Sequence, residues 1–302
     1  MKITITGASG FVGANLSAYL TQNNQTVQGL SLRENNWTVA LDKSADAIIH
    51  LAGKAHDLEN VSNESEYFKI NRDLTIELFQ EFLKSEIKDF FFFSSVKAVA
   101  DTADDIVKED IIPNPLTPYG KSKFEAEEYL LNQQLPERKR LFIVRPCMIH
   151  GTGNKGNLNL LYKVVEKGIP WPLSAFENNR SFLSIDNLSY LVHKMLINSE
   201  IASGVYHFAD DQSLSTNQLI VAMNKALDRK AKFLSIPKGL FEKVAKCGDL
   251  INFPLNSERL KKLTESYVVS NQKIKSALNI KQLPLSAEEG IIKTIKSFKT
   301  GS

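Results

Sequence analysis

The first thirteen residues decide the fold of this chain: Met1-Lys2-Ile3-Thr4-Ile5-Thr6-Gly7-Ala8-Ser9-Gly10-Phe11-Val12-Gly13. The alternating stretch from Lys2 to Thr6 predicts a strand, and an amphipathic helix is predicted directly after it, from Val12 to Gln22. Glycine permits a tight turn and lets the backbone approach a pyrophosphate, which would lie against the N–H groups of the helix N-terminus. A glycine turn in an unrelated α/β protein is the alternative. We predict a dinucleotide-binding turn made by Gly7, Ser9, Gly10, Phe11, Val12 and Gly13.

Strand-like and helical stretches alternate along the chain. Short apolar stretches rich in β-branched and aromatic residues predict buried parallel strands at residues 2–6, 26–31, 47–51, 90–94, 141–145 and 205–208. Helical periodicity predicts helices at residues 12–22, 67–85, 119–133, 158–167, 187–197, 215–227 and 287–298. A strand alternating with a helix indicates βαβ crossovers, so the fold class is α/β, with a Rossmann-type doubly wound parallel sheet.

After Arg145 the regular alternation of predicted strands and helices is replaced by loops rich in Pro, Gly and Asn. We therefore predict a Rossmann dinucleotide-binding domain at residues 1–150 and a smaller C-terminal lobe at residues 151–302, which mainly binds substrate. The strand near residues 204–209 is expected to return to the main sheet.

The composition excludes several classes of protein. Of 302 residues, 43% are hydrophobic and 24% charged, which is typical of a globular chain, and the net charge of +3 is spread without runs of one sign, which disfavours nucleic acid as a partner. No apolar stretch approaches the roughly 20 residues that cross a membrane. The N-terminus shows no signal peptide, and the only two cysteines, Cys147 and Cys247, suit a reducing compartment, so we expect a cytoplasmic protein. The five histidines lack metal-ligand spacing, so no metal is expected.

The residues after the second predicted strand bear on the choice of cofactor. A dinucleotide-binding fold usually places an acid there, which holds the ribose 2′-hydroxyl of NAD. This chain has Ser31 at that place and Arg33 two residues later. A guanidinium there can pair with the 2′-phosphate of NADP, although a solvated surface arginine is the alternative. We expect NADP(H) in preference to NAD(H).

A tyrosine and a lysine stand four residues apart at the start of a predicted helix, in Tyr119-Gly120-Lys121-Ser122-Lys123. That spacing places both side chains on one helical face, where an ammonium would lower the pKa of the phenol and make it a usable acid. The strand Phe90–Phe93 delivers Ser94 and Ser95 at its carboxyl end, where ligands bind in open α/β sheets. We choose Ser95 because one of two successive strand residues faces away. The predicted catalytic residues are Ser95, Tyr119 and Lys123.

Together these residues resemble the extended short-chain dehydrogenase/reductase family, and the resemblance covers nearly the whole chain. His50-Leu51-Ala52-Gly53 is similar to the family's segment beside the nicotinamide, and Asn71 matches a structural asparagine of the next helix. The resemblance therefore implies further cofactor-binding residues, namely Leu51, Ala52, Gly53, Asn71 and Pro146, together with Tyr119 and Lys123 themselves. Members of the family are often homodimers, formed through two helices beside the active site.

Three other stretches resemble one subgroup of that family: Ser94-Ser95-Val96-Lys97, Ala52-Gly53-Lys54-Ala55-His56 and Gly153-Asn154-Lys155-Gly156-Asn157. This subgroup comprises bacterial reductases that act on the C4 ketone of UDP-2-acetamido-2,6-dideoxy-hexos-4-uloses, for surface polysaccharides. The stretch from Asn178 to Asn187 supports the likeness, because its Arg180 matches an arginine that contacts the sugar-nucleotide diphosphate. The resemblance implies substrate-binding roles for His56, Ser95, Lys97, Asn157, Arg180 and Arg259.

The chain also departs from the family pattern. The segment from Glu34 to Ser44 is too short for the usual strand and helix, and it lacks the acid that contacts adenine. Met148 stands where UDP-hexose 4-epimerases usually have asparagine, which argues mildly against an epimerase. A 4-epimerase with tightly bound NAD stays the alternative to a reductase. A cofactor-sensing regulator on the same fold is a third interpretation, although such proteins commonly lose the Tyr-Lys pair.

Overall fold

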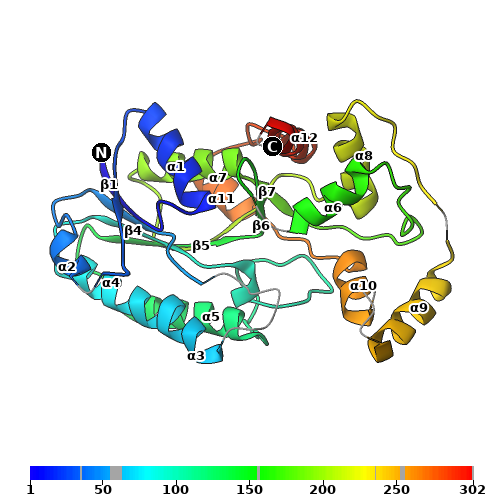
Figure 1. The fold of residues 1–302 in the computed structure, drawn as a ribbon. Coiled ribbons are helices and arrows are strands. Elements are labelled where there is room, and N and C mark those ends of the chain that lie inside the picture. Colours follow the sequence, from blue (N-terminus) through cyan, green and yellow to red (C-terminus); the bar gives the residue numbers. More distant parts are fainter. Residues whose placement is uncertain (35, 55–62, 155–156, 235, 252–255, 301–302) are drawn as a thin grey trace.

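The computed structural model describes the chain except residues 35, 55–62, 155–156, 235, 252–255 and 301–302; the side chains of residues 157, 244, 247–248, 250–251, 258–259, 262 and 300 are also outside the description. At its centre is a parallel sheet of six strands in the order β2-β1-β3-β4-β5-β8 (Figure 1). The strands are β1 (Lys2–Thr6), β2 (Thr26–Leu30), β3 (Ala47–His50), β4 (Asp89–Phe93), β5 (Arg140–Pro146) and β8 (Gly204–Phe208). All six were predicted, with ends within one residue, and the α/β fold class is confirmed.

Helices cover both faces of this sheet (Figure 1). On one face lie α1 (Phe11–Gln22), α7 (Ile185–Leu196) and α11 (Gln272–Leu278), and on the other lie α2 (Trp37–Ala40), α4 (Leu74–Leu83) and α5 (Pro118–Leu131). The four phenylalanines of β4 show how the two cores form. Phe91 and Phe93 pack in the cluster on the α1 side, whereas Phe90 and Phe92 pack in the cluster with α4 and α5. Successive strand residues face opposite sides, so a strand buried on both faces must be apolar throughout.

The helix predicted over residues 67–85 is longer and less regular than expected. It begins with α3 (Glu64–Tyr67), continues through a π-helical turn, η1 (Phe68–Asp73), and ends as α4. Asn71 lies in the π-helical turn and is completely buried. Such a turn is often found at a functional site.

Among the residues described between β2 and β3, the four-residue helix α2 is the only helix or strand. The expectation that this segment is too short for an additional strand and helix is therefore confirmed. As a result, β2 pairs only with β1 and forms an edge of the sheet.

The remaining elements form a C-terminal lobe with its own apolar core. They are the strands β6 (Met148–His150) and β7 (Phe182–Ser184), which pair in parallel, and the helices α6 (Asn157–Glu166), α8 (Thr216–Ala226), α9 (Lys238–Ile251), α10 (Ser257–Thr264) and α12 (Ala287–Thr300). The sequence analysis missed β6, β7, α9, α10 and α11. The three-residue strands β6 and β7 and the short helices α10 and α11 show too few periods to be recognised by pattern. The 14-residue helix α9 is long enough to show helical periodicity, and the sequence analysis overlooked it. Among the described residues, no helix is long and apolar enough to cross a membrane.

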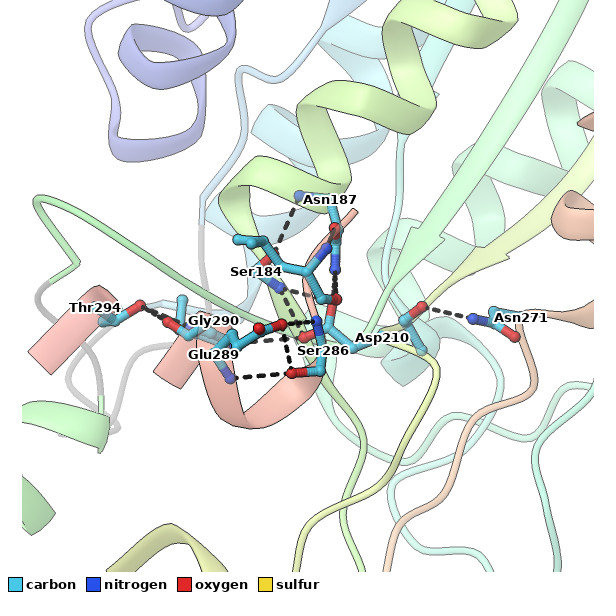
Figure 2. A network of polar contacts seen from close by, with 11 residues as sticks. Ser184, Asn187, Asp210, Asn271, Ser286, Glu289, Gly290 and Thr294 are labelled. Carbon is cyan, nitrogen blue, oxygen red and sulfur yellow. Dashed lines mark hydrogen bonds and ion pairs between the residues drawn. The ribbon is translucent and has the colours of Figure 1, made fainter. Parts of the chain in front are cut away.

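A buried polar network ties this lobe to the sheet (Figure 2). Asp210, just after β8, accepts hydrogen bonds from the backbone N–H of Ser184 at 3.1 Å and from the amide of Asn187 at 2.7 Å. The same Asn187 amide donates to the carbonyl of Leu285, and its oxygen accepts from the Leu285 N–H. One asparagine thus joins the start of α7, the end of β8 and the loop before α12.

Candidate active site

The turn after β1 is packed too closely for any residue but glycine at two positions. Gly7 has a φ of +70°, and a Cβ atom on it would lie 2.8 Å from the backbone nitrogen of Ala52. A Cβ on Gly13 would lie 2.2 Å from the carbonyl oxygen of Gly7. The turn therefore lies directly against the segment after β3, at the carboxyl edge of the sheet.

Helix α1 begins at Phe11, immediately after this turn, and its start suits an anion. Within α1, which the structure describes completely, no side chain caps the N-terminus and no acid occupies the first turn. Its first N–H groups and the positive end of its dipole can therefore receive a negative group. The glycine cradle and this helix start fit the pyrophosphate of a dinucleotide.

Ser95 and Tyr119 are joined by a side-chain hydrogen bond. Ser95 follows β4 in an extended conformation and caps the short turn Val96–Ala98. Tyr119 lies in the first turn of α5, which Thr117 caps through its hydroxyl. A Cβ on Gly120 would lie 2.4 Å from the Lys97 carbonyl, so this glycine lets the start of α5 meet the turn after β4. The two hydroxyls are thereby placed to share one ligand atom.

Lys123, one helical turn after Tyr119, is only 4% exposed. Its ammonium donates to the carbonyl of Phe93 at 2.9 Å and lies 4.9 Å from the centre of the Phe92 ring. Burial lowers the pKa of Lys123 to about 8, while the negative charge of Glu127 opposes that change. Glu127 itself is buried in an ion pair with Arg145 on β5, whose Nη2 lies 2.5 Å from its carboxylate.

The phenol of Tyr119 differs from expectation. Burial raises its pKa above the ordinary value, the hydrogen bond from Ser95 lowers it, and the Tyr67 phenol adds a smaller upward shift. The Lys123 ammonium donates to the strand backbone, at the carbonyl of Phe93. The net shift is therefore upward, opposite to the lowering expected from the sequence, and the phenol stays protonated at neutral pH.

These residues face one cavity of about 260 Å³. Seven residues that the sequence analysis proposed line it: Val12, Leu51, Gly53, Ser95, Tyr119, Lys123 and Pro146. Five others that it did not propose also do so: Lys54, Phe93, Ser94, Cys147 and Ile149. Most of these follow β3, β4 or β5, so the rule that ligands bind at the carboxyl ends of parallel strands could have found them.

Ser94 was expected to face away from the site. It lines the cavity nevertheless, and its buried hydroxyl has no hydrogen-bond partner among the described residues. The strand ends at Phe93, so the strict alternation of faces no longer applies one residue later.

The side chain of Asn71 holds Lys54, which lines this cavity, in place. Its amide donates to the Lys54 carbonyl and to the Ser122 hydroxyl, both at 3.1 Å, and its oxygen accepts from the Lys54 N–H at 2.7 Å. A Cβ on Gly53 would lie 2.9 Å from the Asn71 oxygen and 3.2 Å from Nζ of Lys123. The glycine is therefore required where the segment after β3 passes over Asn71 and Lys123.

The residues expected at the adenosine end lie at the surface. Ser31 and Arg33 are both exposed, and they follow the edge strand β2. Ser9 and Gly10 in the glycine turn are exposed as well.

The candidate substrate residues are less closely grouped. The Lys97 ammonium donates to the Asp101 carbonyl at 2.6 Å and lies 4.5 Å from the centre of the Tyr267 ring. Arg180 is half-buried, its backbone forms a bridge with Leu214, and burial lowers its guanidinium pKa. Neither Lys97 nor Arg180 lines the cavity.

Three further substrate candidates cannot be placed. His56 lies outside the described residues, as do the side chains of Asn157, at the start of α6, and Arg259, in α10. In the part of the chain that the structure describes, no group of three or more His, Cys, Asp or Glu residues could hold a metal ion.

Comparison with known proteins matches this architecture. Residues 3–207 match the model of the NAD dependent epimerase/dehydratase family. A UDP-glucose 4-epimerase from Vibrio cholerae is 27% identical, over 98% of this chain and 95% of that protein. A GDP-6-deoxy-D-mannose reductase from Pseudomonas aeruginosa is 25% identical, over 72% of this chain and 78% of its own length.

A solved structure shares the fold over the entire chain. It is RMD from Pseudomonas aeruginosa complexed with NADPH, which superimposes with a TM-score of 0.76 at 21% identity and covers 100% of this chain and 99% of that one.

Proposed function

This chain belongs to the NAD dependent epimerase/dehydratase family, and from that membership we propose the reaction that it catalyses. It is an NAD(P)-dependent enzyme of the kind that reduces or epimerises nucleotide sugars. The proposed reaction is reduction of the C4 ketone of a UDP-4-keto-6-deoxy-N-acetylhexosamine, for surface-polysaccharide synthesis. The observation that carries the proposal is the Ser95–Tyr119 hydrogen bond at a cavity that Lys123 and Gly53 also line.

The chain's own residues supply the proton and orient the reacting oxygen. Tyr119 is protonated at neutral pH, so its hydroxyl can give a proton to the ketone oxygen as negative charge develops there. Ser95 donates a hydrogen bond to the same oxygen and stabilises that charge. The buried ammonium of Lys123, held by the Phe93 carbonyl, adds a fixed positive charge at the cavity where negative charge develops. When bound, the nicotinamide supplies the hydride that completes the alcohol.

The residues that would hold the cofactor form one continuous edge. The glycine turn, with Gly7, Ser9, Gly10, Phe11, Val12 and Gly13, would hold the pyrophosphate. Leu51, Ala52, Gly53 and Pro146 would flank the nicotinamide, with Asn71 beneath and Tyr119 and Lys123 beside it. We assign this cofactor-binding role to residues 1–150 and the strand near 204–209, and mainly substrate binding to residues 151–302.

We propose NADP(H) in preference to NAD(H). Arg33 is exposed after the edge strand β2, near Ser31, where no carboxylate occupies the usual acidic position. A guanidinium in that place can pair with a 2′-phosphate.

The sugar-nucleotide diphosphate is proposed to bind Arg180 and Asn157, and substrate-binding roles are also proposed for Arg259, Lys97 and His56. A planar guanidinium can hold two phosphate oxygens at once. Arg180 suits that role because it is half-buried, so a bound phosphate would relieve the cost of its burial.

A 4-epimerase is the second candidate, because the Vibrio cholerae relative over nearly the whole chain is named as one. An epimerase regenerates its cofactor in place and has to retain it. Of the residues that the structure describes between β2 and β3, only those of α2 form a helix or strand, and the adenosine end would rest on an edge strand. That arrangement favours a cofactor that exchanges after each turnover, as a reductase requires.

The test separates these reactions directly. The purified protein is denatured, the released nucleotide is identified, and the native protein is supplied with 4-deuterated NADPH and a small panel of 4-keto and 4-hydroxy sugar nucleotides. A reductase transfers deuterium to C4 of a ketone and binds NADPH exchangeably. Tightly held NAD with interconversion of two hydroxyl epimers would contradict the reductase proposal, and turnover of no substrate would favour the regulator.

We propose that the protein works in the cytoplasm on a small nucleotide-sugar substrate and forms a homodimer. The packed pair α4 and α5 beside the site is the surface proposed for the dimer. Light scattering after size-exclusion chromatography measures the mass that tests it.

A further inference from the structure

A chain of buried hydrogen bonds runs beneath the cavity, through residues to which the proposed reaction assigns no role. Thr6, His50 and Thr75 are each at most 1% exposed. The Thr6 hydroxyl lies 2.6 Å from Nδ1 of His50 and accepts a 3.2 Å hydrogen bond from the N–H of Ala52. On the other side of the ring, Nε2 of His50 lies 2.9 Å from the Thr75 hydroxyl, which donates to the backbone carbonyl of Asn71 at 2.8 Å.

The direction of every bond in this chain can be deduced. A carbonyl can only accept, so the single hydrogen of the Thr75 hydroxyl goes to Asn71. Thr75 must then accept from His50, which places a proton on Nε2. In a neutral ring Nδ1 is consequently an acceptor, and it receives the hydrogen of Thr6. The Thr6 oxygen accepts in turn from Ala52, so all the groups are satisfied only when His50 is the Nε2–H tautomer.

The surroundings of His50 keep this ring neutral. It stacks on Phe92, with 5.9 Å between the ring centres, and Nζ of Lys123 lies 4.9 Å from the centre of that same Phe92 ring. Burial, and after it the charge of Lys123, lower the pKa of His50 to about 3. A charged His50 would oppose the ammonium of Lys123, so one buried cation excludes the other.

Both ends of this series of hydrogen bonds contact segments that border the proposed cofactor cleft. Thr6 immediately precedes Gly7, which is packed against the backbone of Ala52. Asn71 fixes Lys54 beside Gly53 and donates to Ser122, whose hydroxyl donates to the carbonyl of Tyr119 at 2.9 Å. The imidazole therefore lies at the centre of a path from the glycine turn to the first turn of α5.

We propose that His50 is a positioning residue, which as its neutral Nε2–H tautomer holds the glycine turn, the segment Leu51–Gly53 and the Asn71 turn in one fixed arrangement around the dinucleotide. This inference rests on the proposed placement of the cofactor in the cleft. It predicts that removing a hydrogen bond of the His50 ring weakens cofactor binding by more than the accompanying loss of folding stability can explain.

The tautomer is tested by NMR of the full chain labelled with 15N in the histidine rings, with the His50 signal assigned from its loss in His50→Gln. The expected signal is that of a neutral Nε2–H ring which does not titrate between pH 5 and 8, a range around the ordinary histidine pKa of about 6.5. An Nδ1–H ring, or titration within that range, would overturn the inference.

Two threonine variants test the positioning itself, and the chain offers a matched control. Thr294 is also buried, donates to the carbonyl four residues earlier and lies 2.8 Å from a buried histidine, His150, but in the C-terminal lobe. Thr75→Val and Thr294→Val each remove one such hydroxyl without changing side-chain volume much. Both are expected to lower the melting temperature by similar amounts.

Only Thr75→Val is expected to weaken NADPH binding, by about tenfold to a hundredfold in the calorimetric dissociation constant, because a buried N–H loses its acceptor beside the cleft. Thr75→Ser, which retains the hydroxyl, should restore most of the affinity. Unchanged NADPH affinity in Thr75→Val, or an equal loss of affinity in Thr294→Val, would overturn the positioning role of His50. The proposed function would not be affected by that result if the wild-type protein still reduces its ketone substrate. A wild type that binds neither NADPH nor NADH would overturn both.

Discussion

The Nζ atom of Lys123 lies 2.9 Å from the carbonyl oxygen of Phe93, the last residue of β4. The lysine on α5 is thus anchored to the strand that leads to Ser95. Its ammonium acts on the site through its charge and its fixed position, so the charge state of this one buried group should control activity.

The pH dependence of activity is expected to show that control. Burial lowers the pKa of Lys123 to about 8, so the ammonium is present below that pH and is lost as the pH rises through it. The value of kcat/KM should therefore fall above pH of about 8, well before the Tyr119 phenol ionises, because burial raises the phenol pKa. The measurement is a pH profile of kcat/KM, from initial rates of NADPH oxidation at ketone concentrations well below the Michaelis constant.

A variant that lacks the negative charge of Glu127 provides the comparison for this pH profile. That charge raises the pKa of Lys123, so the double variant Glu127→Gln with Arg145→Met, which removes the buried ion pair as a unit, should shift the alkaline limb to lower pH. An alkaline limb that stays in place in the double variant would show that Lys123 does not set it.

Tyr119→Phe is expected to abolish most of the turnover and leave cofactor binding intact. The substitution removes only the hydroxyl, so the proton donor is lost, and kcat should fall by about a hundredfold to ten-thousandfold. Ser95→Ala should lose less, because one hydrogen bond to the developing charge disappears while the acid remains. Stopped-flow or steady-state oxidation of NADPH measures both. Near-normal turnover in a Tyr119→Phe protein that binds NADPH normally would exclude Tyr119 as the acid.

Arg33→Ala is expected to weaken NADPH selectively. A charged hydrogen bond to the 2′-phosphate is worth about 1.5 to 3 kcal/mol, or roughly a tenfold to hundredfold change in the dissociation constant. The affinity for NADH, which lacks that phosphate, should stay the same. Direct titration of both nucleotides against the wild type and the variant measures this difference. A wild-type preference for NADH, or equal losses for both cofactors, argues against a 2′-phosphate contact.

Arg180→Ala should raise the Michaelis constant for the sugar nucleotide far more than that for NADPH. The guanidinium is half-buried, and its backbone bridge to Leu214 does not depend on the side chain, so the lobe should keep its fold. Exposed Arg138 is a suitable control position, because it lies in a turn away from the cavity. Equal constants in the Arg180 and Arg138 variants would remove Arg180 from the substrate site.

Asn187→Ala is expected to destabilise the attachment of the C-terminal lobe. The Asn187 side chain bonds both Asp210 and the Leu285 backbone, and its loss leaves buried groups unpaired, at a cost of about 1 to 3 kcal/mol. Urea unfolding measures the loss. Asn132→Ala, at an exposed position after α5, should change stability by less than about 0.5 kcal/mol. Equal free energies of unfolding for the two variants would show that the network in Figure 2 adds little.

Local patterns were sufficient for much of this architecture. The glycine turn, the four phenylalanines of β4 and the Tyr119–Lys123 spacing all predict their elements within a few residues, because a strand or helix repeats over two to four residues. The same patterns led to Ser95, Tyr119 and Lys123, which the structure brings to one cavity.

Other features lie beyond any short window of sequence. Gly53 had to be placed against Asn71 and Lys123 before its lack of a side chain could be explained, and Cys147 and Ile149 line the cavity only because β5 ends beside β4. The sign of the Tyr119 pKa shift was also mispredicted, because it depends on burial and on where the Lys123 ammonium points.

The sequence by itself thus determined the six strands of the central sheet, most of the helices that cover it and the chemistry available at its carboxyl edge. Only the tertiary structure decided which of those groups meet, whether they are buried and which protonation state they prefer. The physical reason is the range of the interactions. Backbone periodicity and turn chemistry act between neighbouring residues, whereas desolvation depends on the packing of all the elements around a group. Hydrogen bonds such as that between Thr6 and His50 join residues that are 44 positions apart.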